Sequence, residues 1–226
     1  TYLVENETAA LIVPSAFLAR LHPHFREVMQ LLALQTADEA RHIEVFTRRA
    51  LLKGGELGLS TVGGRESLQT LISEPDFAAA SFLLSVLGEG SFLPLLAFLR
   101  RYAPEPVTSE VMRLAAQDEA RHVAFGLAHL QRHARNDSGL LGRLAAAAER
   151  RHAALAQTAG LNEEVYDALT LLAAGSFELQ DVERGAKAVL ELVGEMHQVR
   201  SQHLEHLGFT RGEAEAVSSL HTRNFM

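Results

Sequence analysis

The chain has 226 residues, a formal net charge of −7 and no cysteine, with 47% hydrophobic and 22% charged residues. This composition is ordinary for a globular protein that buries a sizeable core, and the acidic balance does not indicate nucleic acid or an anionic membrane as a partner. The lack of cysteine excludes disulfides, zinc–thiolate sites, iron–sulfur clusters and thiol nucleophiles.

Helical patterns extend along almost the whole chain, in which Ala and Leu dominate and clear strand alternation is missing. The first 135 residues are predicted to form helices at 4–21, 23–52, 65–72, 73–102 and 108–134. The first helix should bend near Pro14 and the third long helix near Pro94. A Gly-rich linker is predicted from Gly54 to Gly64.

Two helix starts are predicted from local chemistry. The string Ser73-Glu-Pro-Asp should begin the third long helix with Pro75 in its first turn. Thr108 or Ser109 should cap the fourth. These positions divide the N-terminal part into four long helices and one short helix.

Three more helices are predicted at 140–158, 163–173 and 177–207, with Gly208 ending the last and a short tail after it. We therefore predict one all-α domain over residues 1–226. Residues 1–135 would form a four-helix metal-binding core, and residues 136–226 would pack on it or form the contact of a homodimer. No run approaches the ~20 consecutive apolar residues of a membrane span, and no signal peptide is visible. We expect a cytoplasmic protein, and a start at Thr1 inside a helical pattern suggests a native protein that begins further upstream.

The sequence Asp-Glu-Ala-Arg-His occurs twice, at 38–42 and at 118–122. Each copy contains Glu-x-x-His, and residues three apart lie on the same face of a helix. Glu39 and His42 can therefore share one metal ion, and Glu119 and His122 a second. One copy would fit a solvated helix face, but two identical copies favour a metal site.

Each pair needs a further carboxylate from a neighbouring helix, as in dinuclear four-helix proteins. Glu89 lies before the second copy in an otherwise apolar helix, where an unpaired carboxylate is costly. Before the first copy the chain offers Glu5 and Glu7. The helical face of Glu7 carries the bulkier apolar residues, so Glu7 is the preferred ligand. The predicted metal ligands, which are also the predicted catalytic residues, are Glu7, Glu39, His42, Glu89, Glu119 and His122.

This repeated Glu and Asp-Glu-x-Arg-His pattern resembles the ferritin-like non-haem di-iron oxygenases, especially the p-aminobenzoate N-oxygenase family and the acyl-carrier-protein desaturases. The resemblance covers residues 5–126 and implies a ferritin-like four-helix bundle with two iron ions. It also suggests that Asp38 and Asp118 each orient the histidine of the other half, paired with Arg41 and Arg121. The arylamine N-oxygenases carry an extra histidine where this chain has Ala115.

Three other features have two readings each. Gly88 and Gly90 flank Glu89 and either leave space for oxygen, substrate or movement of Glu89, or allow close helix packing. The apolar residues Phe82, Leu83, Phe92, Leu93 and Phe125 could line a substrate pocket, although ordinary core is the simpler explanation. The late cluster of His197, His203, Glu205 and His206 could form another metal site but is read as solvated.

The expected activity is O2 activation by two iron ions, with a manganese–iron pair suited to the same ligands. The substrate would be a small, partly apolar organic molecule that is hydroxylated, desaturated or N-oxygenated, with an electron-donor protein as a further partner. The chain lacks tryptophan and cysteine, which disfavours a radical-generating reductase subunit and excludes a rubrerythrin. The alternatives are a ferroxidase or iron-handling protein, and a helical interaction protein with a vestigial metal site.

Overall fold

The computed structural model describes residues 1–52, 55–58, 62–156 and 163–220. These residues form helices and connecting turns without a strand, which confirms the all-α prediction. The elements are α1 (Tyr2–Leu18), α2 (Arg26–Leu51), α3 (Val62–Ile72), α4 (Phe77–Ser81), η1 (Phe82–Glu89), α5 (Gly90–Arg101), α6 (Pro106–Ala134), α7 (Leu140–Leu155), α8 (Glu163–Ala174), α9 (Leu179–Leu207) and α10 (Arg211–Leu220). Residues 53–54 and 59–61 of the predicted linker, the last predicted residues of the helix at 140–158 and the end of the tail lie outside the described residues.

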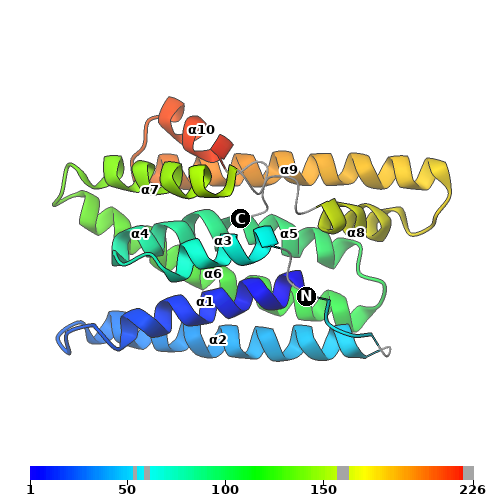
Figure 1. Cartoon of the computed structure of the whole chain (residues 1–226), viewed down its shortest axis with the longest axis horizontal. Coiled ribbons are helices and arrows are strands. Elements are labelled where there is room, and N and C mark those ends of the chain that lie inside the picture. Colours follow the sequence, from blue (N-terminus) through cyan, green and yellow to red (C-terminus); the bar gives the residue numbers. More distant parts are fainter. Residues whose placement is uncertain (53–54, 59–61, 157–162, 221–226) are drawn as a thin grey trace.

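Four long helical segments form the part of the fold that carries the repeated motif. α1 packs along α2, α5 packs along α6, and the two pairs meet through α2 and α6. Figure 1 shows α1 and α2 side by side along one long edge of the molecule. α9 packs on α5, α6 and η1 from outside this group, and α7 contacts α3, α4 and α10. Among the C-terminal helices, α9 therefore packs directly on the segments that carry the motif, as one of the two predictions stated, whereas α8 and α10 pack mainly on α9.

The segment Phe77–Arg101 is the most apolar part of the molecule and combines α4, η1 and α5. By length and composition this segment is long and apolar enough to cross a membrane, although Glu89 and three serines interrupt its apolar residues. However, 83% of its apolar window is buried inside the protein. Its apolar character is therefore explained by its place in the core.

Two helix starts differ from their predictions. Asp76 caps α4 by accepting a hydrogen bond from the Ala79 N–H at 2.8 Å, so Pro75 precedes the helix. α6 begins at Pro106 and is capped by Glu105, which accepts hydrogen bonds from two backbone N–H groups. Pro106 suits the first helical position because its fixed φ matches the helix and its missing N–H is not needed there. The helix therefore starts before the expected caps.

η1 is a π-helix, which sequence periodicity did not predict. It lies in the third long helical segment and ends at Glu89. Pro94 lies further on, inside α5, which continues to Arg101. The departure from α-helical geometry thus falls at the metal-ligand candidate and before the proline. Such π segments are rare and often occur at functional sites.

The C-terminal end contains a helix that the sequence analysis took for a tail. α9 ends at Gly208, whose φ of 119° is in the left-handed region that favours glycine. α10 follows, and its residues Ala214 and Val217 are buried. Its local signal is a capping box, in which the Glu213 carboxylate accepts a hydrogen bond from the Thr210 N–H at 2.8 Å.

Gly126 allows α6 to approach η1 closely. A Cβ atom at this position would lie 2.7 Å from the Cβ of Ser85. We expect Gly126→Ala to lower the free energy of unfolding by about 1–3 kcal/mol, because the added methyl group overpacks this contact. The matched change Gly194→Ala on α9 meets nothing within 4 Å and should raise stability by roughly 0.5–1 kcal/mol. Urea unfolding measures both, and a stabilised Gly126→Ala protein would contradict the close contact.

Candidate metal centre

The structure brings the six predicted ligands together in the interior. Each is no more than 5% exposed. They come from four helical segments, because α1 supplies one carboxylate, α2 and α6 supply one Glu-x-x-His pair each, and η1 supplies the last carboxylate: Glu7, Glu39, His42, Glu119, His122 and Glu89. Glu5 is only half-buried and lies outside both ligand groups, so the structure agrees with the choice of Glu7.

The candidate ligands form two overlapping groups. One contains Glu7, Glu39, His42 and Glu119, the other contains Glu39, Glu89, Glu119 and His122, and the ligand atoms of each lie within 4.8 Å of one another. The sequence analysis had divided the residues into two separate pairs. The structure corrects this division, since Glu39 and Glu119 belong to both groups.

The contacts of the two imidazoles show how the carboxylates are shared. His42 Nδ1 lies 3.3 Å from one oxygen of Glu39 and 3.3 Å from one oxygen of Glu119. His122 Nδ1 lies 3.0 Å from the other oxygen of Glu39 and 3.4 Å from the other oxygen of Glu119. Each shared carboxylate thus directs one oxygen toward each imidazole. Carboxylates in this arrangement can bridge two ions.

Several polar atoms of this cluster are buried without a hydrogen-bond partner among the described residues. They belong to all four carboxylates and both imidazoles: Glu7 Oε1, Glu39 Oε1 and Oε2, Glu89 Oε2, Glu119 Oε2, His42 Nδ1 and His122 Nδ1. Buried polar atoms normally have a partner, and leaving one without is costly. Two bound cations, one in each ligand group, would give these atoms partners. The donor set of oxygen and imidazole nitrogen suits iron, manganese or zinc.

The other side of each imidazole faces an aspartate from the opposite repeat. His42 Nε2 lies 3.2 Å from Asp118 Oδ2, and His122 Nε2 lies 3.1 Å from Asp38 Oδ2. This confirms the crossed pairing that the family resemblance suggested. An Nε2–H group that donates to an aspartate leaves the Nδ1 lone pair directed at the cluster, which is the arrangement of a metal-binding histidine.

Two arginines complete this network on the outer side. Arg41 lies 2.7 Å from Asp38 and 2.5 Å from Asp118. Arg121 lies 2.5 Å from Asp118 and 3.2 Å from Asp38. Each guanidinium therefore contacts both aspartates, and the predicted pairing is confirmed. The arginine side chains are 58% and 60% exposed, so the network runs from the surface to the buried histidines.

Without a cation, the charges of the cluster are balanced by protons. Burial and the neighbouring carboxylates raise the pKa values of Glu7 and Glu89 well above the usual range. Burial lowers the pKa of His122, but its contacts with Glu119 and Glu39 outweigh burial and raise it to about 11. Metal ligands must give up such protons, so cation binding and proton release are coupled at this site.

Gln35 is a site residue that the sequence analysis missed. Its Nε2 donates a hydrogen bond of 2.7 Å to Glu89 Oε1, and the side chain is buried. Gln35 lies one helical turn before Glu39, on the same face of α2, which is the signal that could have revealed it. The corresponding position of the second repeat is Ala115, which has no side-chain donor, so the second repeat has no counterpart of the Gln35 hydrogen bond.

The late histidine cluster is only partly solvated. Glu205 and His206 are exposed as predicted, but His203 is partly buried and its Nδ1 is without a partner among the described residues. A Cβ atom on Gly90 would lie 2.8 Å from that Nδ1. Gly90 therefore permits close packing of α9 on α5, which is the packing reading of this glycine.

Comparisons with known proteins add no assignment. The chain matches no protein-family model, and no curated protein matches it in sequence. The function is therefore argued from the residues of the cluster and their geometry.

Glu7, Glu89 and Glu119 should differ in their effects on metal binding. We expect Glu7→Ala and Glu89→Ala each to weaken one of the two metal positions, because each residue belongs to one ligand group. Glu119→Ala should weaken both positions, since Glu119 belongs to both groups. Glu5→Ala is the control and should bind metal like the wild type. Metal analysis after dialysis measures the outcome, and a loss in Glu5→Ala with none in Glu7→Ala would reverse the assignment.

Asp118→Asn should weaken metal binding although it leaves every candidate ligand in place. His42 would lose the carboxylate that orients its ring, and affinity should fall by roughly 10- to 100-fold. Asp137→Asn, which changes an exposed aspartate paired with Arg143, is the matched control and should bind like the wild type. Competition with a chelator of known affinity gives both values. Equal affinity of Asp118→Asn and the wild type would disprove the orienting role.

Proposed function

We propose that this protein is a ferritin-like, non-haem dinuclear-iron oxidase or oxygenase. It activates O2 to oxidise a small, partly apolar organic substrate. The observation that carries this proposal is the pair of buried four-residue groups that share Glu39 and Glu119, each with one histidine. Two Glu-x-x-His pairs and two further glutamates from four helices are the donor set of ferritin-like dinuclear carboxylate proteins.

The residues of the chain would divide the work at this centre. Two bound iron ions would supply electrons for the reduction of O2. Glu7 and Glu89 would each help to hold one ion, and Glu39 and Glu119 could contribute to both. Asp38 and Asp118 keep the imidazoles oriented, while burial of the whole cluster excludes bulk water. A manganese–iron pair would use the same ligands.

Glu89 is placed so that its binding mode can change. One oxygen accepts the hydrogen bond from Gln35, and the other is buried without a partner among the described residues. Its backbone lies at the end of η1, where the helix departs from α-helical geometry. A carboxylate with one anchored and one free oxygen can bind an ion through either one or both oxygens, which suits a centre whose charge changes during oxidation.

The other expectations belong to this proposal. An oxygenase would need an electron-donor protein and would act in the cytoplasm, with a homodimer as the expected assembly. The ferroxidase alternative uses the same ligands but oxidises iron itself. Oxygen consumption that depends on an organic substrate supports the oxygenase, whereas consumption that depends only on added Fe(II) supports the ferroxidase.

The metal content of the reconstituted protein tests the central proposal. Anaerobic loading with Fe(II) should give two iron ions per chain, about 3.5–4 Å apart as in other two-metal sites. Exposure to O2 should then oxidise both Fe(II) ions to Fe(III) together. Absorbance and Mössbauer spectroscopy measure this oxidation. Because Glu119 belongs to both groups, Glu119→Ala should lower the content of both ions. A wild-type content that stays at or below one iron per chain would overturn the dinuclear centre.

A further inference from the structure

A cavity of about 520 Å³ lies at one end of the four helices that carry the candidate ligands. Sites for small organic molecules usually have volumes of roughly 300–1,000 Å³ and mainly apolar walls. The walls of this cavity are largely apolar and include Leu3, Phe46, Leu95, Leu99, Met112 and Leu169. The volume and the lining fit a small organic ligand. The apolar residues singled out in the sequence do not line this cavity, although Phe92 and Phe125 line two smaller pockets beside the candidate ligands.

The cavity is close to the candidate metal centre along each of three helices. Leu3 precedes Glu7 on α1 by one turn, and Phe46 follows His42 on α2 by one turn, which is about 6 Å of helix. Met112 precedes Glu119 on α6 by two turns, or about 10 Å. The cavity therefore lies beyond one end of the metal centre, about one side-chain layer away.

Phe46 is the side chain between the two. It is 4% exposed, it lines the cavity, and its ring centroid lies 6.0 Å from that of His42. It packs with Leu96, Met112 and Ala115 in one apolar cluster. Ala115 is small, so Phe46, Leu96 and Met112 supply the bulk of this cluster. A rotation of Phe46 would join the cavity to the face of His42.

The charges of the lining disfavour an anionic ligand. Arg49 is the only basic side chain among the described lining residues. Its Nη2 lies 2.9 Å from Glu105 Oε1 and its Nε donates to Thr108 Oγ1 at 2.5 Å, so the guanidinium is already paired. Glu5 and Glu164 also line the cavity. A carboxylate ligand would find two acidic side chains and a cation that already has a partner.

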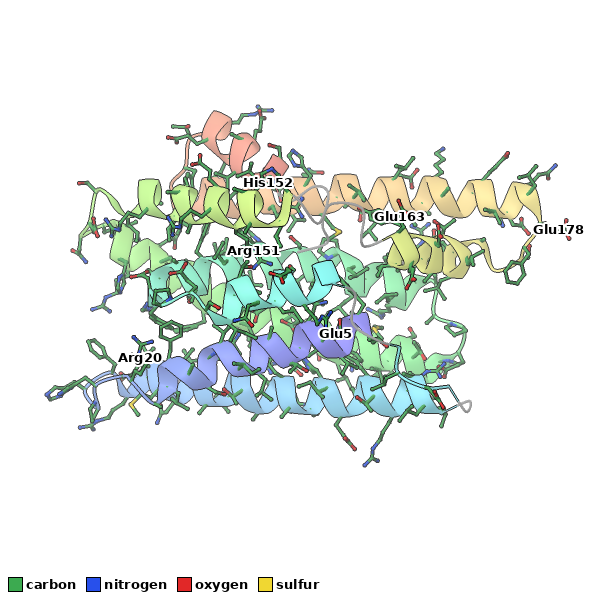
Figure 2. The ribbon with its side chains drawn as sticks, in the orientation of Figure 1. Glu5, Arg20, Arg151, His152, Glu163 and Glu178 are labelled. Carbon is green, nitrogen blue, oxygen red and sulfur yellow. The ribbon has the colours of Figure 1, made fainter. Side chains whose placement is uncertain are left out.

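The C-terminal helices acquire a role from this cavity. Val165, Ala168 and Leu169 of α8 form part of its wall, opposite residues from the start of α1. Figure 2 labels Glu5 near the start of α1 and Glu163 at the start of α8, and both helices contribute to the lining. The exposed residues Ala50 and Glu164 mark where the lining reaches the surface. Without α8, the helical segments that carry the candidate ligands would leave this side of the cavity open.

We propose that this cavity is the substrate site and that it takes a largely apolar organic molecule without a negative charge, which Phe46 separates from the metal centre. That the bound molecule is a substrate rests on the proposed function, but the binding site itself does not require iron. Its test therefore uses binding and position as readouts and is carried out on both metal-free and metal-loaded protein.

Indole and indole-3-carboxylate are suitable probes because they share one ring system and differ in charge. In calorimetric titrations, indole should bind and indole-3-carboxylate should bind at least about tenfold more weakly, for lack of an unpaired cation. Ala168→Trp fills the cavity from the exposed side of α8 and should weaken indole binding by about tenfold or more. Leu171→Trp, on the same helix but outside the lining, is the matched control and should bind indole like the wild type. Circular dichroism establishes that both variants are folded.

The position of the probe is measured by NMR relaxation. Protein loaded with Mn(II) should relax the protons of bound indole faster than protein loaded with Zn(II), because the cavity is adjacent to the metal centre. Phe46→Ala should increase this effect, while Phe46→Leu should stay close to the wild type.

Unchanged indole affinity in Ala168→Trp, tighter binding of the carboxylate, or binding without faster relaxation would each overturn the inference. A metal content at or below one ion per chain, with indole binding still lost in Ala168→Trp, would instead overturn the proposed function and leave the cavity as a ligand site.

Discussion

The structure depends on the cost of burying four carboxylates and two imidazoles in an apolar interior. Isolated charges in such a place are unstable, so they must be paired, protonated or bound to a cation. In this protein each of the six side chains is almost fully buried, and several of their polar atoms lack a hydrogen-bond partner among the described residues. The helices are packed tightly around a cluster that they cannot satisfy by themselves. This makes the cluster a candidate for cation binding and a poor candidate for a purely structural role.

The network outside the cluster links the two repeats. Asp38 belongs to the first repeat but contacts His122 of the second, and Asp118 contacts His42. Arg41 and Arg121 each contact both aspartates. Because each imidazole is oriented by the opposite helix, a shift of α2 against α6 would disturb both histidines. The repeat therefore fixes the relative position of two helices as well as supplying ligands.

The two halves of the ligand set are not equivalent. Glu7 is carried by the α-helix α1, whereas Glu89 ends the π-helix η1 and accepts a hydrogen bond from Gln35. The additional helices are also placed asymmetrically. α9 packs on α5 and η1, and α8 forms part of the cavity wall. A symmetric ligand set is thus placed in an asymmetric protein.

The sequence by itself determined the helices and the ligand candidates, because helical periodicity and Glu-x-x-His spacing are local properties. It also favoured Glu7 over Glu5 from the residues that share each helical face. The tertiary structure alone decided how the ligands are shared, since the distance between Glu39 and His122 depends on the packing of α2 against α6. The hydrogen bond from Gln35 to Glu89, the π-helix η1 and the cavity behind Phe46 also required it. The shared ligands, this hydrogen bond and the cavity arise from contacts between residues far apart in the chain, which local spacing cannot specify.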